Sequence, residues 1–101
     1  MEVEFATNKL EKCYLDVRLA TRTWGGETVG RKYIQRIDLI QDASNMKEIE
    51  ALPGLECHPL KGKRKDQHAV TLHDRWRLIF SLSGDKAEFI RVEEVNKHYG
   101  D

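Results

Sequence analysis

The apolar residues of this chain change their spacing near residue 66, and this change constrains the fold more than any other feature. Before it, Val29, Tyr33, Ile37 and Ile40 recur at helical spacing, which predicts a helix over 27–42. After it, apolar and polar residues alternate, which is typical of strands with one buried face. A helical first half and a stranded second half predict a two-layer α+β fold.

The N-terminal residues predict a short strand followed by a first helix. Val3 and Phe5 alternate with acidic residues, and Asn8 with Glu11 has the spacing of a capping box. We expect the helix to end before Trp24, where two glycines follow. The buried stripe of this helix is predicted to contain Leu10, Tyr14, Val17 and Leu15.

The remaining pattern predicts a short helical turn over 45–51 and strands over 68–73, 76–82 and 86–95. The expected order is β-α-α-β-β-β, with the N-terminal strand and two helices packed on a C-terminal antiparallel sheet. Residues 1–101 are expected to form a single domain. The solvated face of the 27–42 helix is predicted to carry Arg31, Lys32, Gln35, Arg36 and Asp38.

Composition excludes several classes of protein. The chain has 101 residues, 40% of them apolar, and no apolar run near the length of a membrane span. Its first residues lack the features of a secretory signal, so we expect a cytoplasmic protein with no membrane partner. Cys13 and Cys57 could pair, but reduced thiols are favoured in that compartment. Because no CxxC or HxxxH spacing occurs, no metal site is expected, and no cofactor motif is present.

The net charge is zero, yet cations are concentrated in one region. Residues 58–77 contain six Lys or Arg but two acids, Asp66 and Asp74. Within this region, four cations surround Gly62 in a loop that leads into a strand: Lys61, Lys63, Arg64 and Lys65. Such a loop suits phosphate contacts along a nucleic-acid backbone. A solvated surface loop is the alternative, and charge alone does not separate the two.

Arg77 is a second candidate site residue. Trp76, Leu78, Phe80 and Leu82 share one face of their strand, which places Arg77 with Ile79 on the other face. Thr71 and His73 of the preceding strand could share that surface. An arginine there can clamp a phosphate or stabilise transition-state charge. A cross-strand salt bridge to Glu88 or a neighbouring acid is the alternative.

The third candidate is the C-terminal pair His98-Tyr99. Histidine titrates near neutral pH and can move a proton during RNA cleavage, and tyrosine can stack on a base. A frayed terminus without a function is the alternative.

Several short motifs resemble one known family when they are taken together. The motifs are 5–10 (Phe-Ala-Thr-Asn-Lys-Leu), 52–55 (Leu-Pro-Gly-Leu), 58–62 (His-Pro-Leu-Lys-Gly) and 76–80 (Trp-Arg-Leu-Ile-Phe). Their order and content resemble the HigB branch of the RelE/ParE toxin superfamily, over nearly the whole chain. The resemblance implies a RelE-like fold and an mRNA endonuclease of a type II toxin–antitoxin system. It implies cleavage on the ribosome, without a metal, by attack of the ribose 2′-hydroxyl on the neighbouring phosphate.

The resemblance also implies roles for individual residues. Lys61 matches the lysine of the Leu-Lys-Gly motif, and Arg77 the arginine of the aromatic-Arg-Leu strand. His98 is the best proton-transfer candidate, Tyr99 an orienting or stacking group, and His58 a second proton carrier. Many HigB relatives end with Val-Asp-Tyr-His, whereas 95–99 reads Val-Asn-Lys-His-Tyr, so the acid is replaced by asparagine.

The implied partners are a HigA-like helix-turn-helix antitoxin and mRNA on the ribosome. Two other functions stay open at this point. A ParE-like toxin would inhibit DNA gyrase without cutting RNA, and an RNA-binding module would hold RNA without cleaving it. The cationic loop and the terminal histidine favour the nuclease.

Overall fold

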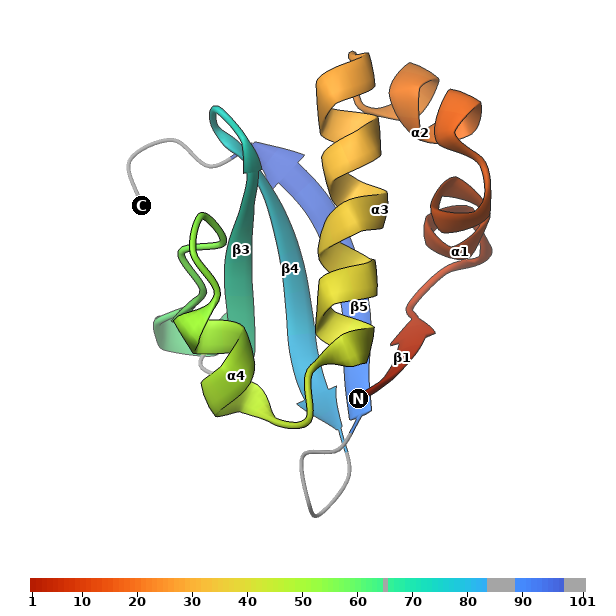
Figure 1. Ribbon diagram of the computed structural model, residues 1–101. Helices are drawn as coiled ribbons and strands as arrows, with labels where there is room; N and C mark the ends of the chain where they lie inside the picture. The colour runs from red at the N-terminus through yellow and green to blue at the C-terminus, as the bar shows by residue number, and fades with distance from the viewer. Residues whose placement is uncertain (65, 84–88, 98–101) are drawn as a thin grey trace.

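The chain forms one mixed sheet with helices packed against one of its faces (Figure 1). The computed structural model describes residues 1–64, 66–83 and 89–97. The elements are β1 (Glu2–Phe5), α1 (Asn8–Leu15), α2 (Val17–Thr23), α3 (Glu27–Asp42), α4 (Met46–Ala51), β2 (His58–Pro59), η1 (Gly62–Arg64), β3 (Gln67–His73), β4 (Trp76–Ser83) and β5 (Phe89–Lys97).

The sheet has the strand order β1-β5-β4-β3-β2. The meander β3-β4-β5 is antiparallel, as the alternation predicted, and β2 extends it at one edge. The N-terminal strand does not pack on this sheet as part of another layer. It joins the sheet, parallel to β5, with Val3 opposite Ile90. The α+β class is therefore confirmed, with a mixed sheet in place of an antiparallel one.

The predicted first helix is two helices, because Asp16 interrupts it. The backbone of Asp16 is extended, and its carboxylate accepts hydrogen bonds from the backbone N–H groups of Arg18 and Leu19. The change of direction leaves Leu15 73% exposed and Val17 37% exposed, so their predicted burial is wrong. The helix starts one residue earlier than the capping-box spacing indicated, since Thr7 is the N-cap.

Helix α3 carries the apolar stripe predicted for it. Val29, Tyr33, Ile37 and Ile40 are all buried, and the Tyr33 hydroxyl donates to the Leu10 carbonyl at 2.7 Å. Burial raises the pKa of that hydroxyl, so it remains a donor. The sheet side of the same core contains Val70, Leu72, Leu78, Phe80, Ile90 and Val92.

One residue of the predicted polar face of α3 is buried. Arg36 is 8% exposed, and its Nε donates to the Thr71 carbonyl at 3.1 Å. Beyond the short strand β2, no strand formed by the described residues pairs with the outer edge of β3. The Thr71 N–H there donates to the Leu55 carbonyl at 2.7 Å. Arg36 and Leu55 thus satisfy the backbone of Thr71 at an uncovered sheet edge.

Candidate functional site

On the sheet face turned away from α3 the side chains form rows, because residues paired across antiparallel strands point to the same side, and two of these rows contain candidate residues. This surface is called the second face below. The first row, from β2 to β5, consists of His58, Ala69, Ile79 and Glu94. The second, the Arg77 row, consists of Thr71, Arg77 and Asn96. Figure 1 shows the helices on the opposite side of these strands.

The centre of the second face is packed rather than open. Ala69 and Ile79 are fully buried, yet neither belongs to the core beneath the helices. Polar side chains therefore surround a small apolar patch. His73 does not share this face as predicted, since an irregularity between Thr71 and His73 brings His73 opposite Trp76.

Arg77 is half-buried and held by the turn before it. Its Nη1 donates to the carbonyl oxygens of Asp74 at 2.7 Å and Trp76 at 3.0 Å. Asp74 has a φ of 53°, a left-handed conformation that tightens the turn between β3 and β4. The guanidinium is therefore fixed at the end of the sheet where this turn lies, as a phosphate clamp requires.

His58 lies on β2, half-buried, with its Nδ1 3.0 Å from the Glu56 carbonyl oxygen. A carbonyl only accepts, so this contact places the proton on Nδ1 and makes Nε2 the basic nitrogen of the neutral ring. By standard strand dimensions, the Cα atom of His58 lies about 7 Å along the sheet and about 10 Å across it from that of Arg77. The two side chains can act on one substrate segment.

The cationic loop lies at the other end of β3. Lys61 and Lys63 are exposed, and Arg64 ends η1. Gly62 has a φ of 71°, a conformation that favours glycine, so the Leu-Lys-Gly sequence makes the turn into η1. A hydrogen bond of 2.9 Å from the Leu60 N–H to the Gln67 carbonyl closes the loop. Lys65 lies outside the described residues.

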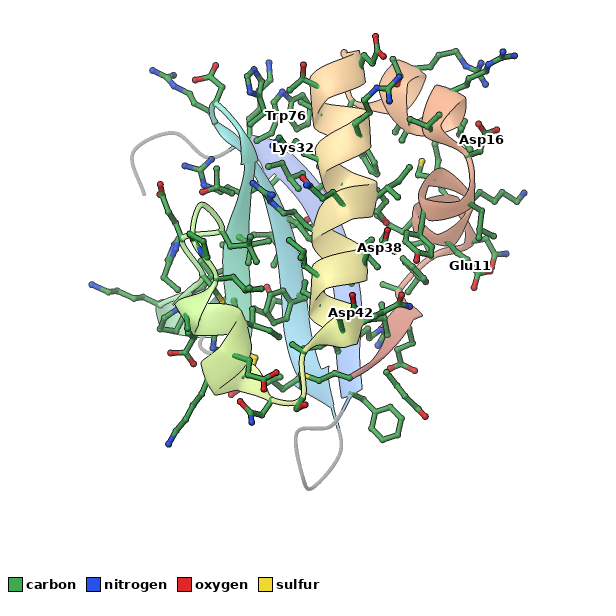
Figure 2. The ribbon with its side chains drawn as sticks, viewed as in Figure 1. Glu11, Asp16, Lys32, Asp38, Asp42 and Trp76 are labelled. Carbon is green, nitrogen blue, oxygen red and sulfur yellow. The ribbon has the colours of Figure 1, made fainter. Side chains whose placement is uncertain are left out.

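His98 and Tyr99 also lie outside the described residues. The strand before them ends at Lys97, which pairs with Trp76 beside the β3–β4 turn. The Lys97 Nζ lies 5.1 Å from the centre of the Trp76 ring, a cation–π contact. Asp74, Arg75, Trp76 and Lys97 line a pocket of about 390 Å³. The sequence did not predict this pocket, because it forms only where strands distant in the sequence pair. Figure 2 labels Trp76, one of its lining residues.

The other titratable groups near the site differ in their environment. Burial lowers the pKa of His68, whose ring stacks on Phe80 with centroids 5.6 Å apart. Burial raises the pKa of Cys57 to about 11, so this thiol stays protonated at neutral pH. Both Cys13 and Cys57 are free thiols.

Across residues 1–64, 66–83 and 89–97, no group of three His, Cys, Asp or Glu side chains is placed to hold a metal ion. Within the same residues, no helix has the length and apolar character that crossing a bilayer requires.

Comparison with solved structures relates this fold to bacterial toxins. A YoeB/ParE toxin from Agrobacterium tumefaciens aligns with a TM-score of 0.60 and 19% identity, over 98% of this chain and 100% of the toxin. YafQ from E. coli strain BL21(DE3) aligns with a TM-score of 0.59 and 21% identity, over 96% of this chain and 92% of YafQ. The chain therefore has the RelE-like fold of YoeB and YafQ toxins.

Some of the similar structures are complexes of a toxin with its antitoxin. YafQ in the E. coli DinJ–YafQ complex aligns with a TM-score of 0.61 and 22% identity, over 96% of this chain and 91% of that chain. YoeB from Staphylococcus aureus aligns with a TM-score of 0.54 and 14% identity in its complex with YefM, over 98% of both chains. No family model and no curated protein sequence matches this chain.

Proposed function

We propose that this chain is the toxin of a type II toxin–antitoxin system and that it cleaves mRNA. The observation that carries the proposal is the position of His58 and Arg77 on the same face of one sheet, in adjacent rows. A basic imidazole nitrogen and a fixed guanidinium supply two of the functions that cleavage by a 2′-hydroxyl needs. The toxin fold of YoeB and YafQ supports the same class.

The reaction breaks a P–O bond without a metal. A base removes the proton of the ribose 2′-hydroxyl, whose oxygen attacks the adjacent phosphorus. The 5′-oxygen of the next nucleotide leaves with a proton from an acid, and a 2′,3′-cyclic phosphate remains. We assign proton transfer to His98 and His58, orientation or stacking to Tyr99, stabilisation of the charged transition state to Arg77, and phosphate binding to Lys61.

The exposed cationic loop is proposed to bind the RNA backbone away from the reacting phosphate. Lys61 and Lys63 are accessible there, and Arg64 and Lys65 follow in the chain. The motifs at 52–55, 58–62 and 76–80 favour a HigB-like toxin within the superfamily. We therefore propose a HigA-like antitoxin as the partner, mRNA on the ribosome as the substrate and the cytoplasm as the site of action.

Mapping of transcript 5′ ends after induction in cells tests the nuclease. The wild-type chain should create new internal 5′ ends, and Arg77→Ala should reduce them by about 10²-fold or more, the usual cost of losing a transition-state cation. Arg18→Ala is the matched control, because Arg18 is exposed on α2 and distant from the second face. It should leave cleavage unchanged.

Purified components separate the remaining alternatives. Cleavage of mRNA should need ribosomes and leave a cyclic phosphate end. Induction that damages DNA without new RNA ends would establish the gyrase-inhibiting alternative instead. RNA that is bound but never cut, with or without ribosomes, would show a binding module and overturn the nuclease.

A further inference from the structure

On either side of Arg77, its row contains two buried polar atoms that have no hydrogen-bond partner among the described residues. They are Thr71 Oγ1 on β3 and Asn96 Oδ1 on β5, one on each side of Arg77. Buried polar atoms in folded proteins almost always have partners, and each exception needs an explanation, such as a catalytic role or a bound water or ion. Two such atoms beside a guanidinium suggest that the ligand is polar and anionic.

The orientation of the Asn96 amide follows from its neighbour on β5. Its Nδ2 donates to Glu94 Oε1 at 2.7 Å, and an ionised carboxylate only accepts hydrogen bonds. The NH₂ group must therefore face Glu94, which leaves Oδ1 as an acceptor that needs a donor. The N–H and carbonyl of Thr71 are themselves bonded, to Leu55 and Arg36, and Thr71 Oγ1 has no partner among the described residues.

The spacing of the row limits what these atoms contact. Thr71 and Asn96 are separated by two strand spacings, about 10 Å, with Arg77 between them. One small group cannot reach both ends of the row. If Arg77 holds a phosphate at the middle of the row, different parts of the same nucleotide would lie near Thr71 and near Asn96.

We propose that Asn96 Oδ1 accepts a hydrogen bond from the ribose 2′-hydroxyl of the nucleotide on the 3′ side of the phosphate that Arg77 binds, which is not the attacking hydroxyl. The Thr71 hydroxyl donates to a non-bridging oxygen of that phosphate. The inference rests on the proposed function and adds a discrimination step to it. The 2′-hydroxyl is the donor that RNA has and DNA lacks, so Asn96 is a specificity residue for RNA, whereas a phosphate contact serves both nucleic acids.

Binding of matched RNA and DNA oligomers tests the two contacts separately. Titrations use the His98→Ala background, and a denaturing gel afterwards confirms that the RNA is intact. Adding Asn96→Ala should reduce the affinity for RNA by about three- to tenfold, the effect of one net hydrogen bond, and leave the affinity for DNA unchanged. Adding Thr71→Val, which keeps the side-chain shape, should weaken RNA and DNA equally.

Glu94→Gln gives a second test that keeps the asparagine in place. A glutamine can accept or donate, so the Asn96 amide is no longer held in one orientation, and the preference for RNA should fall by a smaller factor than with Asn96→Ala. Urea unfolding of each variant confirms that it folds. Equal weakening of RNA and DNA by Asn96→Ala would overturn the assignment.

Measuring cleavage on ribosomes beside the relative affinity for RNA and DNA distinguishes failure of this inference from failure of the proposed function. If the wild-type chain cleaves RNA on ribosomes while the Asn96→Ala variant keeps the full preference for RNA, the role of Asn96 is wrong and the nuclease stands. If the wild-type chain neither cleaves RNA nor prefers it to DNA, the proposed function is wrong and this inference falls with it.

Discussion

Replacement of Arg36 tests whether helix α3 stabilises the strand that carries Thr71, the first residue of the Arg77 row. Its Nε donates to the carbonyl of Thr71, the first residue of that row, and only 8% of Arg36 is exposed. Replacing Arg36 with methionine keeps much of the side-chain volume and removes the donor. The Thr71 carbonyl then loses its bond to this side chain at the uncovered edge of β3.

Two opposing contributions set the expected change in the free energy of unfolding. A hydrogen bond from a charged donor contributes about 1.5–3 kcal/mol net. Burial also lowers the pKa of Arg36, which shows that the charged form is poorly solvated, and methionine avoids that cost. We therefore expect Arg36→Met to lower the free energy of unfolding by about 1–2 kcal/mol, which corresponds to a Tm lower by roughly 4–16 °C.

Urea unfolding with an unchanged m value measures this loss. Gln35→Ala is the control, because Gln35 is exposed and its Oε1 accepts from Arg36 Nη1 at 3.1 Å. It should change the free energy by less than about 0.5 kcal/mol. An Arg36→Met variant as stable as the wild type, or a control that loses as much, would refute the reasoning.

Two further predictions concern stability. A Cβ on Gly30 would lie 2.8 Å from the Thr21 backbone nitrogen. Gly30→Ala should therefore lower the free energy of unfolding in urea by about 1–2 kcal/mol, although alanine has the better helix propensity. Gly26→Ala is the control and should lower it less, because a Cβ on Gly26 has no atom within 4 Å. Because the pKa of His68 is lowered by folding, the unfolded chain binds the proton more readily, and the free energy of unfolding should fall as the pH drops below about 6.5. His68→Leu should flatten this decline between pH 7 and 5, and exposed His73→Gln should not; equal slopes in all three proteins would contradict it.

Local patterning predicted those parts of the fold that depend on short segments. The stripe of α3 and the alternation in β3 and β4 each need only a few neighbouring residues to be read. The break at Asp16 was missed because Leu10, Tyr14 and Val17 continue a helical spacing through it. The burial of Arg36 was missed because its partner, Thr71, is 35 positions away in the sequence.

The candidate site could be predicted only as a set of residue types. Motif content identified His58, Lys61 and Arg77, whereas their arrangement depends on strand register. The pairing of Arg77 with Asn96 joins residues that no local rule connects, and a bulge between Ile79 and Phe80 sets that register. The role proposed for Asn96 therefore needed the structure, although the sequence already showed asparagine in place of an acid.

The cationic loop and Arg77 cannot act on the same phosphate. Lys61 follows Leu60, which bonds Gln67, and Thr71 of the Arg77 row lies four positions after Gln67 on β3. This places the two about 14 Å apart along the sheet and about 10 Å apart across it, while Arg77 is bonded to the turn at the far end. His58 lies between them. An RNA strand that spans the second face would thus be bound at the loop and cut nearer Arg77. Replacing Lys63 with alanine should therefore weaken RNA binding and reduce its salt dependence more than it slows the cleavage step.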